Sequence, residues 1–211
     1  MKKLLATLTL ALLANAGLAL EVQGVQLDDT ARVAGGDLRL NGAGVRSAGP
    51  GKEVYVAGLY LREKSQSAEK TITAKQPRRL VLVFNRDMKS SVLQSAFRDG
   101  IGLNVTGAEM DRLSAEVSSL EQTMAKIAEV KAGDRLALDV QADGSVAISY
   151  NGAAQGTLGG PDIGPAMLKI WLGDVPVSDD LKNALLANAH YGPKALMRKT
   201  AFDSLFDRMS P

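Results

Sequence analysis

The chain has 211 residues, of which 45% are hydrophobic and 23% are charged, and these ordinary globular values suit one domain better than two. Its 25 basic residues outnumber the 23 acidic ones only through Lys2 and Lys3 at the start, so the remainder is close to neutral. This balance argues against a nucleic-acid partner, which clustered basic residues would attract, and the absence of cysteine excludes disulfides and thiol chemistry.

Residues 1–19 have the pattern of a secretory signal peptide. The basic start Met1-Lys2-Lys3 precedes the apolar run Leu4–Leu13, and Gly17-Leu18-Ala19 has the small-x-small form of a cleavage site. The apolar run is too short to anchor the chain in a bilayer, and no later stretch approaches the roughly 20 apolar residues of a transmembrane helix. We therefore expect a soluble, exported mature protein, located in a bacterial periplasm because no lipid-attachment cysteine is present.

The first half of the mature chain is rich in predicted strands. Residues 21–36 are weakly alternating and polar, which suits an edge strand or an irregular lead-in. Strands are predicted at 37–46 and 52–62, with glycine and proline supplying the turn between them. After the polar connector 62–76, the run 79–84 reads as a strand that is buried on both faces.

Helical spacing of apolar residues then replaces the strand pattern. A helix is predicted over residues 88–101, and a second one to about Ile127 begins with a capping box at Thr106 and Glu109. The stripe of this second helix is too short for a coiled coil and indicates a helix docked on the core.

From Arg135 the period returns to two, which predicts a three-strand meander ending near Leu158. Helices are predicted next over residues 163–171 and over a segment capped by Ser178. The element order therefore predicts an α+β protein in which helices pack on a large antiparallel sheet. We divide the chain into three parts: a signal peptide at 1–19, one domain at 20–188 and an amphipathic tail at 189–211.

Most common catalytic constellations are missing from the sequence. The single histidine, His190, has no cysteine nucleophile and no Gly-x-Ser-x-Gly serine to activate as a base. The possible metal ligands form no recognisable loop pattern. The glycine-rich segment Gly156–Gly164 lacks the spacing of a phosphate-binding loop. We therefore expect neither a metal nor a cofactor.

Arg46 is the polar residue that stands out. Strict alternation along its strand predicts one face shared by Leu38, Leu40, Gly42, Gly44 and Arg46. A guanidinium on an apolar face needs a partner, either an internal carboxylate or the carboxylate of a ligand. The two glycines, which lack side chains, are expected to leave room for a ligand beside the backbone.

These residues resemble a known signature. The stretch Leu40–Arg46, followed by Val54–Leu61, is similar to the G-x-G-x-R…x-G-x-Y-x pattern of the chalcone isomerase fold family, and in particular to its bacterial exported chalcone isomerase-like group. The resemblance continues at Ala132–Leu136 and Leu168–Asp174, and it covers about Glu21 to Leu186.

The resemblance implies an open-faced β-sandwich, in which a ligand cleft lies between a large antiparallel sheet and the helices packed on it. In fatty-acid-binding members an arginine and a tyrosine hold the ligand carboxylate, and Arg46 fits that arginine position. The catalytic threonine of the isomerases would fall near Tyr55, and their catalytic tyrosine near Met88–Ser91, where this chain has no tyrosine.

Three functions remain open from the sequence. The first is an exported, non-catalytic binding protein that holds an apolar carboxylate, such as a fatty acid, through Arg46 and Tyr55. The second is an isomerase (an intramolecular lyase) acting on a phenolic or enone substrate, which rests on the fold resemblance alone. The third is a structural or partner-binding periplasmic protein, and the oligomeric state is open in all three.

Cleavage after Ala19 is the first testable prediction, because the basic start, the apolar run and the small residues Gly17 and Ala19 together form a signal-peptide pattern. N-terminal sequencing of the exported protein should begin at Leu20. A mature protein that retains residues 1–19 would instead indicate a membrane-tethered chain.

Overall fold

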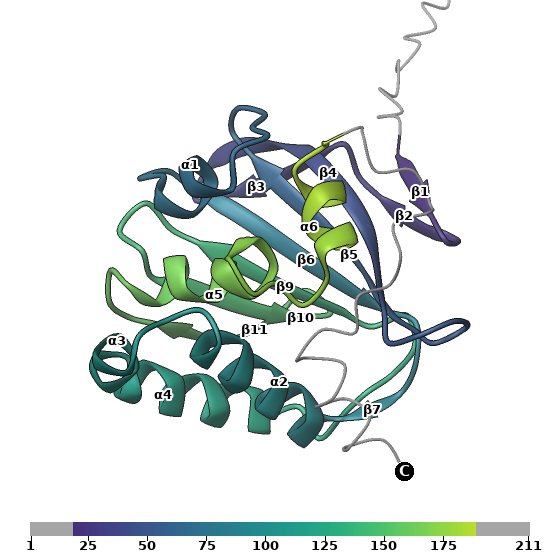
Figure 1. The fold of residues 1–211 in the computed structure, drawn as a ribbon. Helices are drawn as coiled ribbons and strands as arrows, with labels where there is room; N and C mark the ends of the chain where they lie inside the picture. The colour runs from purple at the N-terminus through teal and green to yellow at the C-terminus, as the bar shows by residue number, and fades with distance from the viewer. Residues whose placement is uncertain (1–18, 189–211) are drawn as a thin grey trace, which may run out of the picture.

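The computed structural model describes residues 19–188, which form a large curled antiparallel sheet with helices packed on one face (Figure 1). The strands of this sheet are β3 (Thr30–Val33), β4 (Gly36–Ser47), β5 (Glu53–Leu61), β6 (Arg78–Phe84), β9 (Arg135–Val140), β10 (Val146–Tyr150) and β11 (Ala153–Leu158). Their order across the sheet is β11-β10-β9-β6-β5-β4-β3. Two small two-stranded sheets pair β1 (Leu20–Val22) with β2 (Val25–Leu27) and β7 (Met88–Lys89) with β8 (Glu129–Val130).

The helical layer comprises α1 (Ala68–Thr73), α2 (Ser90–Gly102), α3 (Gly107–Arg112), α4 (Ser114–Ala125), α5 (Ile163–Leu172) and α6 (Asp179–Leu185). Helix α6 lies on β4, α4 lies beside β11, and α2 packs between α4 and α5 (Figure 1). This arrangement confirms the predicted α+β class and the large antiparallel sheet covered by helices. The predicted signal peptide, apart from Ala19, the tail at 189–211 and His190 lie outside the described residues.

The two central strands, β5 and β6, are apolar on both faces because both faces are covered. On the helical side, Ala57, Leu59, Leu80 and Leu82 belong to the main core. On the opposite side a smaller core includes Tyr60, Val81 and Val83, and it is closed by residues such as Leu27 of the β1–β2 hairpin.

A β-bulge at Asn41 divides β4 into two parts. Leu40 pairs with Tyr60 and Gly42 pairs with the adjacent Leu59, so Asn41 is an extra residue without an opposite partner. Leu38 and Leu40 consequently lie in the small core on the far side of the sheet, whereas Gly42, Gly44 and Arg46 face the helices. The prediction that these five residues share one face of the strand is therefore wrong for the two leucines.

The glycines of β4 make room for helix α6 instead of a ligand. A Cβ atom on Gly42 would lie 2.7 Å from the carbonyl oxygen of Leu185 and still closer to that of Ala184. A Cβ atom on Gly44 would lie 2.7 Å from the Ala184 Cβ. The expectation that these positions leave space for a ligand is wrong, because the backbone of α6 fills the space at Gly42 and α6 side chains fill it at Gly44.

The buried Asn41 side chain ties this contact together. Its amide donates to the Leu185 carbonyl at the end of α6 (2.7 Å) and to the Ser65 carbonyl (2.9 Å), and its oxygen accepts from the Ser65 backbone N–H (2.8 Å). The bulge thus supplies a partner for a carbonyl group at a helix end, where the helix itself offers none.

Other departures from the predicted elements are local. The lead-in 21–36 forms the hairpin β1–β2 and strand β3, and the connector 62–76 contains helix α1. Met88 belongs to β7, so α2 begins only at Ser90. The capping box is confirmed by the bonds from the Thr106 N–H to Glu109 Oε2 (2.7 Å) and from the Glu109 N–H to Thr106 Oγ1 (3.2 Å), but the helix it starts is interrupted at Leu113.

Within residues 19–188, none of the helices has the length and apolar character that a membrane crossing requires.

Replacing Gly42 by alanine should destabilise the protein by about 1–3 kcal/mol, because the new methyl group would push α6 away from β4. The matched control is Gly107→Ala at the first position of α3, where a Cβ atom meets nothing within 4 Å. This control should be neutral or stabilising by up to about 1 kcal/mol. Urea unfolding measures both variants, and equal stabilities would contradict the tight contact between α6 and β4.

Candidate functional site

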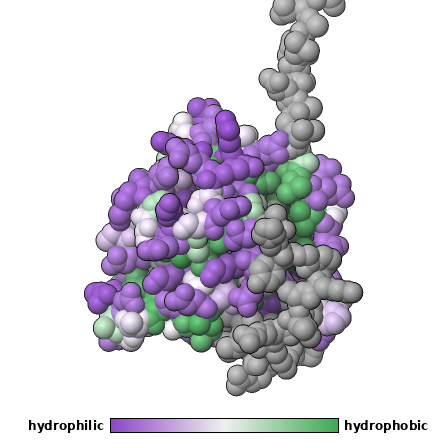
Figure 2. All heavy atoms as spheres, turned by 45° about the horizontal axis from the view of Figure 1, so that its top comes forward, coloured by the Kyte–Doolittle hydropathy of each residue, from purple (hydrophilic) through white to green (hydrophobic). Residues whose placement is uncertain are grey.

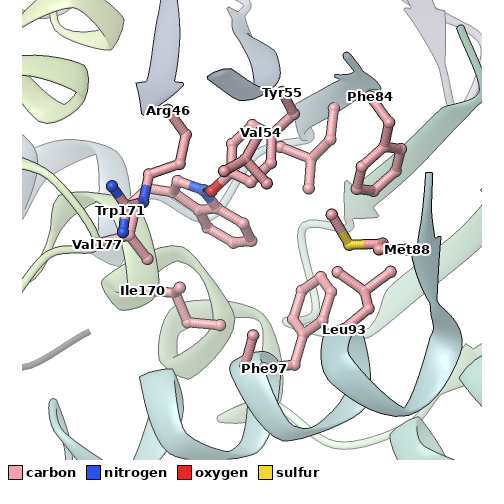
Figure 3. Close-up of a pocket in the computed structure, with 12 residues that line it drawn as sticks. Arg46, Val54, Tyr55, Phe84, Met88, Leu93, Phe97, Ile170, Trp171 and Val177 are labelled. Carbon is pink, nitrogen blue, oxygen red and sulfur yellow. Dashed lines mark hydrogen bonds between the residues drawn. The ribbon is translucent and has the colours of Figure 1, made fainter. Parts of the chain in front are cut away.

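A small cavity lies between the sheet and the helical layer and is apolar except at one end (Figure 3). Its walls come from β4, β5 and β6 on one side and from α2 and α5 on the other, with Met88 of β7 and Val177 after α5 completing them. The lining residues are Arg46, Val54, Tyr55, Leu82, Phe84, Met88, Leu93, Ala96, Phe97, Ile170, Trp171 and Val177. Its volume is about 20 Å³, which is enough for about one water molecule.

The structure brings the two predicted site residues, Arg46 and Tyr55, together at this cavity. They are opposite each other in the pairing of β4 with β5, and both line the space. Only 3% of the Arg46 surface and 6% of the Tyr55 surface is exposed. Arg46 faces the helices because the bulge at Asn41 lies upstream of it in β4.

The Arg46 guanidinium donates a hydrogen bond from Nη1 to the backbone carbonyl of Ser47. In Figure 3 it points toward the side of the cavity formed by Trp171 and Val177. Arginine carries five N–H donors in a planar fork, so one guanidinium can hold several acceptors at once. The group places a permanent positive charge at one end of an apolar space.

Trp171 of α5 is a further member of the site. Its indole Nε1 donates to the Tyr55 hydroxyl over 3.0 Å, across the interface between helix and sheet. Because indole is a donor only, the Tyr55 oxygen must be the acceptor, and the phenolic hydrogen stays available for another bond. Among residues 19–188 no acceptor for this hydrogen is found. Trp171 therefore positions the Tyr55 hydroxyl as a donor.

Packed aromatic rings fix the rest of the cavity wall. The Tyr55 ring meets Phe84 edge to face at 6.1 Å, and Phe97 of α2 meets Trp171 in the same way at 5.8 Å. Met88 lines the cavity in the region where the isomerases would carry their catalytic tyrosine. A thioether is a weak acceptor and donates no hydrogen bond, so Met88 contributes apolar surface and no acid or base.

Burial raises the pKa of Tyr55 to about 12, and the nearby Arg46 charge and the Trp171 hydrogen bond offset only part of this effect. The phenol is therefore neutral at physiological pH and acts as a hydrogen-bond donor rather than a base. A cation and a neutral donor beside an apolar cavity match a carboxylate carried on an apolar chain. In the part of the chain that the structure describes, no three His, Asp or Glu side chains come together as metal ligands.

Replacing Tyr55 by phenylalanine should make the free energy of unfolding decrease less steeply with pH above pH 10. The unfolded chain releases this proton near pH 10 and the folded chain only near pH 12. The free energy of unfolding should therefore fall by up to about 1.4 kcal/mol per pH unit between these values through Tyr55 alone, while below pH 10 its contribution is complete.

The measurement is urea unfolding at a series of pH values from 8 to about 12. Tyr60 and Tyr150, whose pKa values are also raised to about 12, remain in both proteins and contribute equally to each. Parallel pH profiles for wild type and Tyr55→Phe would show that Tyr55 ionises as easily in the folded chain as in the unfolded one.

Comparison with known proteins gives a family and a fold. A family model described as chalcone isomerase-like matches residues 19–187. A fatty-acid binding protein of Arabidopsis thaliana has a similar crystal structure, with a TM-score of 0.63 and 15% identity over 81% of this chain and 97% of that one. A search of curated proteins finds no significant match. Since the family model covers nearly all of the described residues, the chain belongs to the chalcone isomerase-like family.

Proposed function

We propose that this protein is an exported, periplasmic binding protein that holds an apolar carboxylate, such as a fatty acid, without transforming it. The observation that carries the proposal is the pairing of Arg46 and Tyr55 at the polar end of an otherwise apolar cavity. The name of the Arabidopsis neighbour, a fatty-acid binding protein, supports the same ligand class. Export rests on the signal-peptide pattern of residues 1–19.

Arg46 and Tyr55 would both bind the carboxylate group of the ligand. The guanidinium meets the two carboxylate oxygens through its planar fork, and the Tyr55 hydroxyl, fixed by Trp171, donates to one of them. The hydrocarbon chain would extend along the apolar walls of Phe84, Leu93 and Phe97. Because the cavity holds only about one water molecule, the chain must displace side chains of the cavity wall as it enters.

An isomerase remains the alternative, and the third reading, a structural or partner-binding periplasmic protein, has no site of its own among the described residues. The binding reading is preferred to the isomerase because Met88 lines the cavity where the catalytic tyrosine is expected. The neutral Tyr55 phenol supplies a donor but no base at physiological pH.

Replacing Arg46 by methionine should weaken palmitate binding about ten- to a hundredfold, the value of a charge-assisted hydrogen bond. Arg46→Lys should restore binding only in part, because an ammonium group lacks the planar fork. Arg39→Met is the matched control, since Arg39 lies on the same strand but is exposed. Trp171, the single tryptophan of the sequence, lines the cavity, so its fluorescence can follow each titration.

Urea unfolding of the same variants separates ligand binding from stability. The proposal fails if Arg46→Met binds palmitate as well as wild type does. It also fails if wild type binds no palmitate and Arg46→Met is merely several kcal/mol less stable, which is the mark of a broken internal ion pair.

A further inference from the structure

A second, larger cavity lies at the opposite end of the central strands and opens to solvent. It is formed by residues 61–67, which follow β5, by α1, and by the start of β6, and its volume is about 500 Å³. Arg78 lies on its wall at the start of β6, whereas Tyr55 pairs with Phe84 at the end of that strand. At about 3.4 Å per residue, the two sites are about 20 Å apart. The α1 end of the molecule presents a mainly hydrophilic surface (Figure 2).

The charge of this cavity is strongly positive. Its walls carry Arg62, Lys64, Lys70 and Arg78. They carry one acidic residue, Glu63. Arg62, Lys64 and Lys70 are exposed, and none of them forms an ion pair with another residue in the range 19–188. Three net positive charges therefore border one open space.

Arg78 is the unusual member of this group, because it is buried and bonded only to carbonyl groups. Just 2% of its surface is exposed. Its Nη1 donates to the carbonyls of Thr71 (3.0 Å) and Ile72 (2.8 Å) in the last turn of α1. Its Nε is buried without a hydrogen-bond partner in the described part of the chain.

Arg78 differs from the neighbouring Arg79 in having no carboxylate partner among the described residues. Arg79 forms a bidentate pair with Asp139, at 2.6 and 2.7 Å, whereas Arg78 has no carboxylate partner within residues 19–188. Backbone carbonyls solvate a guanidinium but carry no net charge that could neutralise it. Burial lowers the pKa of Arg78 to about 10, so it still carries its charge at neutral pH.

We propose that this cavity binds an anion that carries a phosphate group. Such a group has about two negative charges at neutral pH. It would neutralise the positive charge of Arg78, for which the described residues supply no carboxylate. Arg62, Lys64 and Lys70 would contact the anion directly, since arginine forks and lysine ammonium groups both bind phosphate oxygens. Arg78, buried in the cavity wall, would attract the anion electrostatically, since its charge has no carboxylate partner among the described residues.

Calorimetric titration with inorganic pyrophosphate at low ionic strength tests the proposal. Lys64→Gln and Lys70→Gln should each weaken binding about two- to fivefold, as expected for exposed charged contacts. Lys75→Gln is the matched control, because Lys75 is an exposed residue just after α1 that does not line the cavity. Its affinity for pyrophosphate should equal that of wild type.

Arg78→Met should abolish pyrophosphate binding, and unchanged Trp171 fluorescence would show that this variant is still folded. If the variant does not fold, the lysine variants alone decide the test.

A second experiment uses phosphatidylglycerol vesicles, with phosphatidylcholine vesicles as the reference. Pyrophosphate binding that depends on Lys64 and Lys70 supports a soluble phosphate compound, and the same dependence with vesicles alone assigns the group to a lipid. Binding to neither probe, or an equal loss in Lys75→Gln, overturns the proposal. Palmitate binding reports on Arg46 separately.

Discussion

One extra residue in β4, the bulged Asn41, determines which side chains the sheet presents to the helices. Before it, Leu38 and Leu40 fill the small core on the far side, and after it Gly42, Gly44 and Arg46 face the helical layer. The same residue holds the end of α6 through the Leu185 carbonyl. Because a one-residue change of register exchanges the two faces of a strand, the docking of α6 and the inward direction of Arg46 both depend on this bulge.

Two buried arginines lie near opposite ends of the central strands, Arg46 on the neighbouring strand β4 and Arg78 at the start of β6, and their surroundings differ. At the Arg46 end, a tyrosine and a tryptophan from different layers are linked by a hydrogen bond beside an apolar cavity. At the Arg78 end, helix carbonyls hold the guanidinium and further basic residues surround an open space. Arg79, fully paired with Asp139, shows that this sheet can also neutralise an arginine internally. The sheet thus surrounds its buried arginines in three ways: with an aromatic pair at Arg46, with backbone carbonyls at Arg78 and with a carboxylate at Arg79.

The sequence predicts the main strands and helices because their apolar residues repeat with clear periods of two or of three to four. It singles out Arg46 and Tyr55, which the structure pairs across β4 and β5, but it assigns Leu38 and Leu40 to the wrong face, since a bulge leaves no trace in an alternating pattern. Helix α1 escapes prediction because it is short and largely polar, and contacts such as that with Arg78 hold it. The bond between Trp171 and Tyr55 joins residues 116 positions apart, which no local pattern can reveal.

The small volume of the cavity beside Arg46 has a kinetic consequence. Space for about one water molecule admits no longer chain until side chains of the cavity wall, such as Leu93 and Phe97, move apart. The rate of association of any such molecule should therefore level off at the rate of cavity opening as the concentration of the molecule rises. An open form present in about one molecule in a hundred would lower the apparent affinity about a hundredfold below that of the open form itself. Substitutions that loosen the packing around the cavity, for example at Leu93 or Phe97, should then speed both the entry and the escape of an occupant.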